Sequence, residues 1–141
     1  MRVVVTQKTR TVLLEVPRQA AKHKAGMRNA LHDVGQIYGK EIERLLTAER
    51  KTGRKYAKLP NRSSAPGEAP QSQSGRLLKS YNYRVNSPFR MTVGERAKYA
   101  GFLEDGTGRM RRRPHLLVAA NNIAGDVIDY FYQRSDREIG R

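Results

Sequence analysis

The chain has 141 residues, of which 38% are hydrophobic, enough for one domain with a modest core and little room for a second. Its 28 Lys and Arg against 13 Asp and Glu give a formal net charge of +15. Self-repulsion at this charge disfavours an isolated compact monomer and favours nucleic acid, an anionic membrane or an acidic protein surface as a partner.

The membrane is the least favoured of these partners. No apolar run approaches the roughly 20 residues that span a bilayer, and no signal peptide opens the chain. Cysteine is absent, which excludes disulfides, thiolate zinc sites and a cysteine nucleophile. That absence fits assembly in a reducing cytoplasm.

Two extended segments are predicted first. Residues 2–7 are rich in β-branched side chains, which is typical of a strand. A second extended segment covers 11–16, after the polar residues 8–10. We expect a β-hairpin, and the alternative is a helix that begins directly after the first strand.

A long amphipathic helix is predicted from Pro17 to about Lys51, because proline suits the first helical turn. Apolar residues recur there at steps of three and four, at Met27, Leu31, Val34, Tyr38, Ile42 and Leu45. Gly26, Gly35 and Gly39 each cost about 1 kcal/mol in a helix interior. They indicate either the close approach of another backbone or a bend.

Residues 52–75 are rich in Pro, Ser and Gly and contain too few apolar residues for a core. They include basic side chains at Arg54, Lys55, Lys58 and Arg62. A loop of this length in a compact domain is uncommon. Two interpretations remain open: an extended arm that docks on a neighbouring subunit, or a mobile loop.

A short helical turn over 75–79, capped by Ser74, comes next. Apolar residues then alternate in 81–85 and 89–93, and Asn86-Ser87-Pro88 between them favours a turn. This pattern predicts a second β-hairpin with one buried face.

The last third of the chain is expected to contain a loop over 104–108, a basic run over 109–113 and a helix opened by Pro114. The apolar stripe of that helix comprises Leu117, Ala120, Ile123, Ala124, Val127, Ile128 and Phe131. The helix should end near Arg134, which leaves 135–141 as a polar tail. The predicted fold class is α+β, with the long N-terminal helix and the C-terminal helix packed on a small, mostly antiparallel sheet in one domain spanning 1–141.

The sequence offers little for catalysis. His23 and His32 lie nine residues apart on the first helix, about 180° from each other, so they cannot share a metal ion. His115 lies beside Arg113 in a cationic setting, and all three histidines are expected at the surface or in interfaces. Glu104 and Asp105 could as a carboxylate pair bind a cation or act as acid and base, but the favoured prediction is a tight turn at Asp105-Gly106, with Glu104 paired to a following arginine. We therefore expect no enzyme activity, catalytic residue, metal or cofactor.

The basic residues are the remaining candidates for function: Arg109, Arg111, Arg112 and Arg113 in one run, and Arg54, Lys55, Lys58 and Arg62 in the other. They could contact DNA phosphates without sequence preference, pair with carboxylates of a neighbouring subunit, or form a solvated loop. No DNA-reading motif accompanies them.

The order of several segments resembles a known family. These are Ala65-Pro66-Gly67-Glu68-Ala69-Pro70, Ser74-Gly75-Arg76-Leu77-Leu78-Lys79-Ser80, an alternating hairpin, Tyr99-Ala100-Gly101-Phe102-Leu103-Glu104-Asp105-Gly106-Thr107, and Arg113-Pro114 before a terminal helix. Together they are similar to the tail-completion, or head–tail joining, proteins in the neck of long-tailed bacteriophages. The basic runs over 50–62 and 109–113 depart from the simplest form of that pattern.

The resemblance implies a non-enzymatic virion protein, assembled in the host cytoplasm, that joins the head connector to the tail as a homo-oligomeric ring around the DNA channel. Such rings are commonly sixfold, and twelvefold rings occur in adjacent connector layers. The implied partners are further copies of the chain, the neighbouring neck, connector and tail-tube proteins, and phage DNA, bound nonspecifically. A tail terminator that caps the tail tube and a general nucleic-acid-binding protein are the alternatives.

One part of the pattern has a physical explanation of its own. Glu104, Gly106 and Thr107 form a turn in which the glycine can supply a positive φ. With Pro114 opening the last helix, this turn should fix the angle between sheet and helix and project residues 109–113 outward.

Overall fold

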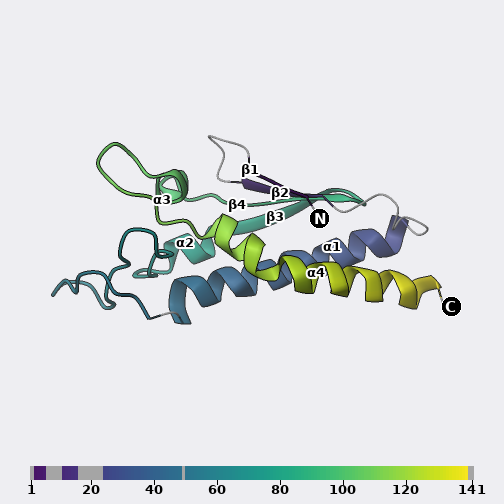
Figure 1. The fold of residues 1–141 in the computed structure, drawn as a ribbon, viewed down its shortest axis with the longest axis horizontal. Helices are drawn as coiled ribbons and strands as arrows, with labels where there is room; N and C mark the ends of the chain where they lie inside the picture. The colour runs from purple at the N-terminus through teal and green to yellow at the C-terminus, as the bar shows by residue number, and fades with distance from the viewer. Residues whose placement is uncertain (1, 6–10, 16–23, 49, 140–141) are drawn as a thin grey trace.

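The computed structural model describes residues 2–5, 11–15, 24–48 and 50–139. In chain order its elements are β1 (Arg2–Val5), β2 (Thr11–Glu15), α1 (Lys24–Glu43), the π-helical turn η2 (Arg44–Ala48), α2 (Arg76–Lys79), β3 (Tyr81–Ser87), β4 (Arg90–Glu95), α3 (Ala100–Asp105) and α4 (Leu116–Ile139). The strands form one layer, and α1 and α4 lie side by side against one face of it (Figure 1). The predicted α+β class is confirmed.

The four described strands form one antiparallel sheet in the order β1-β2-β4-β3. Both predicted hairpins are confirmed, since β1 pairs with β2 and β3 pairs with β4. The pairing of β2 with β4, with Val12 opposite Val93, joins the two hairpins. Residues 6–10, which connect β1 and β2, and Val16 lie outside the described residues.

The apolar stripe predicted for the first helix is confirmed, because all six of its residues are buried. The helix boundaries differ from the prediction. Pro17, the expected start, lies outside the described residues, and the regular helix gives way to η2 after Glu43. The chain then turns back, so that the N–H of Ser72 and the ammonium of Lys51 donate to the carbonyls of Leu46 and Leu45, both at 2.8 Å. These bonds satisfy carbonyls at the helix end that have no partner within the helix.

Two of the glycines of α1, Gly35 and Gly39, face tyrosine rings and not another backbone. A Cβ on Gly35 would lie 2.6 Å from the ring of Tyr83, and one on Gly39 would lie 2.9 Å from the ring of Tyr81. The Tyr81 hydroxyl donates to the carbonyl of Gly35 at 2.7 Å. Because these two positions lack a side chain, Tyr81 and Tyr83 of β3 can pack directly on α1.

The C-terminal helix is longer than predicted, and its buried face is rotated. Its buried side chains are Leu116, Ala119, Ala120, Ile123, Val127 and Phe131, whereas Leu117, Ala124 and Ile128 are half-buried. Pro114 lies two residues before the helix instead of opening it. The prediction of a polar tail over 135–141 was wrong as far as Ile139, because no Gly or Pro lies between Arg134 and Gly140 to end the helix.

Polar contacts also tie the two long helices together. The Tyr130 hydroxyl donates to Asp33 at 2.6 Å, and the Asn122 amide donates to Glu41 at 2.7 Å. Among the described helices, none has the combination of length and apolar character needed to cross a membrane.

Candidate functional site

Two basic segments that are far apart in sequence meet at one end of the molecule, where α3 and the connecting loops project beyond the sheet (Figure 1). The N–H of Gly67 donates to the carbonyl of Arg112 at 3.0 Å, and Nε of Arg113 reaches the carbonyl of Ser64 at 3.4 Å. We call residues 50–75 and 106–113 together the cationic end.

Residues 50–75 contain no helix or strand and are held by their own polar contacts. The Glu68 carboxylate accepts hydrogen bonds from the N–H of Thr52 at 3.1 Å, the N–H of Ala65 at 2.8 Å and the Thr52 hydroxyl. These bonds, first of all the one from the Thr52 side chain, lower the pKa of Glu68. Asn61 and Gln73 exchange two further bonds across the loop, both at 3.1 Å. Glu68 thus closes the base of the loop.

The four basic residues predicted as candidates in this loop are all exposed. The guanidinium of Arg54 lies over the ring of Tyr56, 5.3 Å from its centroid. Lys55 donates to the carbonyls of Leu59 and Pro60 at 2.9 and 2.6 Å, and Arg62 donates to the carbonyl of Gly53 at 2.9 Å. These contacts orient Arg54, Lys55 and Arg62. Their partners are an aromatic ring and neutral carbonyls, so within the described residues no carboxylate offsets the positive charge of these three side chains.

Gly106 has the positive φ predicted for it, 78°. A Cβ there would lie 2.9 Å from the backbone of Met110 and Arg112, so only glycine fits. Thr107 closes the following turn: it exchanges backbone bonds with Met110, and its hydroxyl accepts from the Met110 N–H at 3.1 Å.

Arg109, Arg111 and Arg112 are exposed beyond this turn, as predicted. Arg113 is half-buried against Ser64, so the expectation that it projects outward with the others was wrong.

The predicted loop over Glu104 and Asp105 was also wrong, since both residues belong to α3. Glu104 does not pair with an arginine. Its carboxylate accepts from the N–H groups of His115, Leu116 and Leu117 at 2.9, 3.2 and 3.0 Å, and so caps the start of α4. A carboxylate at this position is favourable, because the first N–H groups of a helix have no partner within it and carry partial positive charge.

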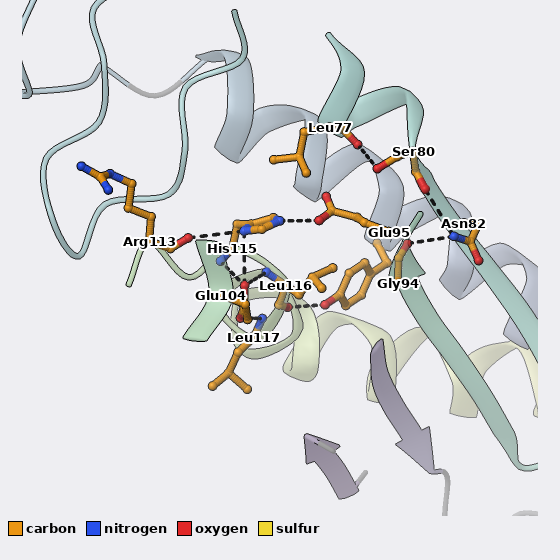
Figure 2. Close-up of polar contacts among 11 residues, drawn as sticks. Leu77, Ser80, Asn82, Gly94, Glu95, Glu104, Arg113, His115, Leu116 and Leu117 are labelled. Carbon is orange, nitrogen blue, oxygen red and sulfur yellow. Dashed lines mark hydrogen bonds and ion pairs between the residues drawn. The ribbon is translucent and has the colours of Figure 1, made fainter. Parts of the chain in front are cut away.

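His115 is fully buried, which contradicts its predicted place at the surface. Figure 2 shows its ring between two carboxylates, with Nε2 2.7 Å from Glu95 of β4 and Nδ1 3.2 Å from Glu104 of α3. The phenol of Tyr38, from α1, donates to the carbonyl of Leu116 beside them. We call Glu95, Glu104 and His115 the buried cluster. His32 is exposed and packs edge-on against Tyr83, and His23 lies outside the described residues.

Burial lowers the pKa of His115, but the hydrogen bond and charge of Glu95 and the charge of Glu104 outweigh it, so the net shift is upward. The two carboxylates on either side of the His115 ring thus favour its protonated form. Burial, together with the neighbouring Tyr81, Glu104 and Glu95, raises the pKa of Tyr38 well above its ordinary value, so its phenol keeps the proton it donates.

The buried cluster joins three elements to one another. Glu95 and His115 are shielded from solvent, and the second Glu95 oxygen, Oε1, has no hydrogen-bond partner among the described residues. Within the described part of the chain, no three His, Asp or Glu side chains are arranged to hold a metal ion. The geometry fixes β4, α3 and α4 relative to one another and so positions the 106–113 turn.

The cationic end also carries a groove that the sequence patterns did not reveal. The groove has a volume of about 340 Å³ and lies between residues 56–75 and α3, with Leu77 and Leu103 in its lining. Tyr56, Leu59 and Tyr99, which also line it, are exposed to 46, 36 and 42%. Phe102 of α3 is exposed to 58%. The sequence signal was hidden because these residues follow no period.

The short helical turn predicted after Ser74 is present as α2, but Ser74 is not the residue that caps it. Gly75, with φ 74°, is the N-cap residue of α2, and the Ser74 hydroxyl accepts only a long bond of 3.4 Å from the Arg76 N–H.

Comparison with protein-family models gave no match, and neither did searches of curated proteins and of solved structures.

Proposed function

We propose that this chain is a structural protein of a tailed bacteriophage that joins head to tail as a homo-oligomeric ring around the DNA channel. The family resemblance of the 99–107 segment and the α+β architecture support this proposal. In it, the protein works through contact surfaces and carries out no reaction.

The observation that carries the proposal is the construction of the cationic end. Two loops that are distant in the sequence are hydrogen-bonded into one surface, and that surface is attached to the core through the Glu104 cap and the buried cluster. Large exposed apolar side chains beside uncompensated charge are typical of surfaces that other macromolecules cover. A ring subunit needs such a surface in a fixed orientation.

A separate part of the cationic end suits the DNA channel. Arg109, Arg111 and Arg112 are exposed on a turn held by Gly106 and Thr107. Arginines that contact phosphates give affinity that is independent of sequence and falls steeply with salt. In a ring, these side chains would face the DNA, and the phosphates would offset part of the charge of +15.

The test is a nonsense allele of the gene in its phage. Loss of the protein should leave filled heads and finished tails unjoined in electron micrographs, and supplying the chain should restore infectious particles. A cryo-EM map of the intact particle should place the subunit in the neck; a position at the end of the tail tube would identify a tail terminator instead. Normal joining without the protein would refute the proposal.

A general nucleic-acid-binding protein is the second candidate, favoured by the same three exposed arginines. It would bind duplex DNA tightly as a monomer, with a steep dependence on salt. The neck protein should bind DNA weakly and self-associate. Sedimentation with and without a DNA duplex separates the two.

A further inference from the structure

A second charged surface lies on the outer face of α4. Asp126, Asp129 and Tyr132 are exposed there, three residues apart, so they share one side of the helix. Tyr132 is 48% exposed. Two arginines follow toward the C-terminal end of α4: Arg134, half-buried and two residues after Tyr132, and Arg137, exposed and five residues after it. We call these three residues the acidic face.

The acidic face and the groove are complementary in chemistry. The loop that forms one wall of the groove carries four exposed basic side chains outside the lining itself, Arg54, Lys55, Lys58 and Arg62, and one carboxylate, Glu68. Arg76 and Arg113 line the groove itself, and Tyr56, Leu59 and Tyr99 offer apolar surface. Two carboxylates and one aromatic ring on a rigid helix therefore match a basic rim around an apolar floor.

The two surfaces cannot meet within one molecule. The groove lies at the end of the molecule where α3 and the loops project, whereas α4 runs from there toward the opposite end, where the C-terminus lies (Figure 1). When two different, complementary surfaces lie apart on the same subunit, copies associate head to tail. Such contacts give a closed ring if the rotation between copies closes.

We propose that the groove of one copy binds the acidic face of the next copy, with Tyr132 on the apolar floor and Asp126 and Asp129 against the basic rim. This inference rests on the proposed function, because it names the contact that builds the ring. The aliphatic lining from Leu59, Leu77 and Leu103 favours a protein side chain over nucleic acid, since the phosphates that supply most of the nonspecific affinity for nucleic acid gain nothing from aliphatic groups.

Charge reversal on the full chain tests this contact. Variant A carries Asp126→Lys and Asp129→Lys, and variant B carries Arg54→Glu and Arg76→Glu. All four side chains are exposed, so both variants should fold, which circular dichroism would check. In sedimentation velocity the wild type should form oligomers, and self-association should weaken by about tenfold or more in each variant. An equimolar mixture of A and B should associate again, because each reversed surface then meets its reversed partner.

A matched control separates the contact from net charge. Arg28→Glu with Arg84→Glu makes the same charge change as variant B, at exposed positions on α1 and β3 that lie outside both the groove and the 50–75 loop. It should leave self-association at the wild-type level or strengthen it. A control as defective as variant B, a mixture of A and B that stays dissociated, or a wild type that is monomeric with and without duplex DNA would overturn the inference.

Two further outcomes separate the failure of the groove contact from the failure of the proposed head–tail function. If variant B loses DNA binding and keeps its self-association, the groove serves nucleic acid and the inference is wrong. If A and B fail to assemble singly, assemble together, and yet phage lacking the protein join normally, the contact stands and the head–tail function fails.

Discussion

The helix–sheet interior and the cationic end are stabilised in different ways. The interior buries apolar side chains at regular steps on α1 and α4, against Met91 and Val93 of β4. The cationic end buries few apolar side chains and depends on the Glu68 carboxylate and the side-chain amides of Asn61 and Gln73, which bond to backbone N–H and carbonyl groups. Apolar residues at a helical period are sufficient to build the interior, whereas the cationic end depends on individual polar residues. Substitutions should therefore lower stability most in the interior and act mostly locally at the cationic end.

The largest effect is expected from removing a ring in the interior. Phe131→Ala should lower the free energy of unfolding by about 3–5 kcal/mol, because the buried ring leaves a cavity between the helices. Urea denaturation measures the change. Gln133→Ala, at an exposed position two residues away, should stay within about 0.5 kcal/mol. Equal losses would mean that α4 is not packed as described.

Two glycine substitutions test the packing of the interior further. Gly35→Ala should cost about 1–3 kcal/mol, because its Cβ would lie 2.6 Å from the Tyr83 ring. Gly125→Ala, where a Cβ meets open space, should instead stabilise α4 by up to about 1 kcal/mol. Thermal melts of the two variants should shift in opposite directions. A stabilising Gly35→Ala would contradict the packing of β3 on α1.

Glu104→Gln tests the cap of α4, which joins the interior to the cationic end. The amide keeps one acceptor oxygen and loses the charge at the start of α4, so unfolding should become easier by about 1–2 kcal/mol. Asp105→Asn, an exposed neighbour, is the matched control and should have little effect. A loss equal to that of the control would show that Glu104 does not cap α4.

The buried cluster should make stability depend on pH. The pKa of His115 is raised in the folded state, so its protonated form contributes stability that is fully present below the unfolded pKa, near about 6.5, and is lost as pH rises through the folded pKa. Denaturant titrations from weakly acidic to alkaline pH should show this decline. His115→Gln should remove it, whereas His32→Gln should retain it. A profile unchanged by His115→Gln would refute the ion pair.

The smallest effect on global stability is expected within the cationic end. Glu68→Gln weakens the bonds that close the base of the 50–75 loop, so trypsin should cleave faster at Arg54 to Arg62 while the melting temperature changes little. Glu43→Gln, an exposed carboxylate on α1, is the control and should leave cleavage unchanged. Slow cleavage in both variants would mean that other contacts close the loop.

The sequence by itself determined the α+β class, both hairpins, the stripe of α1 and the positive φ of Gly106. Each of these depends on contacts between near neighbours or on the conformational range of one residue, and both are visible in a local pattern. The boundaries of α4 and its rotated face were less predictable, because packing against α1 decides which of several adjacent apolar residues is buried.

Only the tertiary structure decided the functional features. Glu104 and His115 were read as a turn residue and a surface residue, because their partners lie in other elements and no spacing reveals them. The meeting of the 50–75 loop with the 106–113 turn, and the groove beside it, likewise arise from hydrogen bonds between segments that are distant in sequence. The charge composition favours an anionic partner, and only the three-dimensional placement of the basic residues shows which of them lie together on one surface.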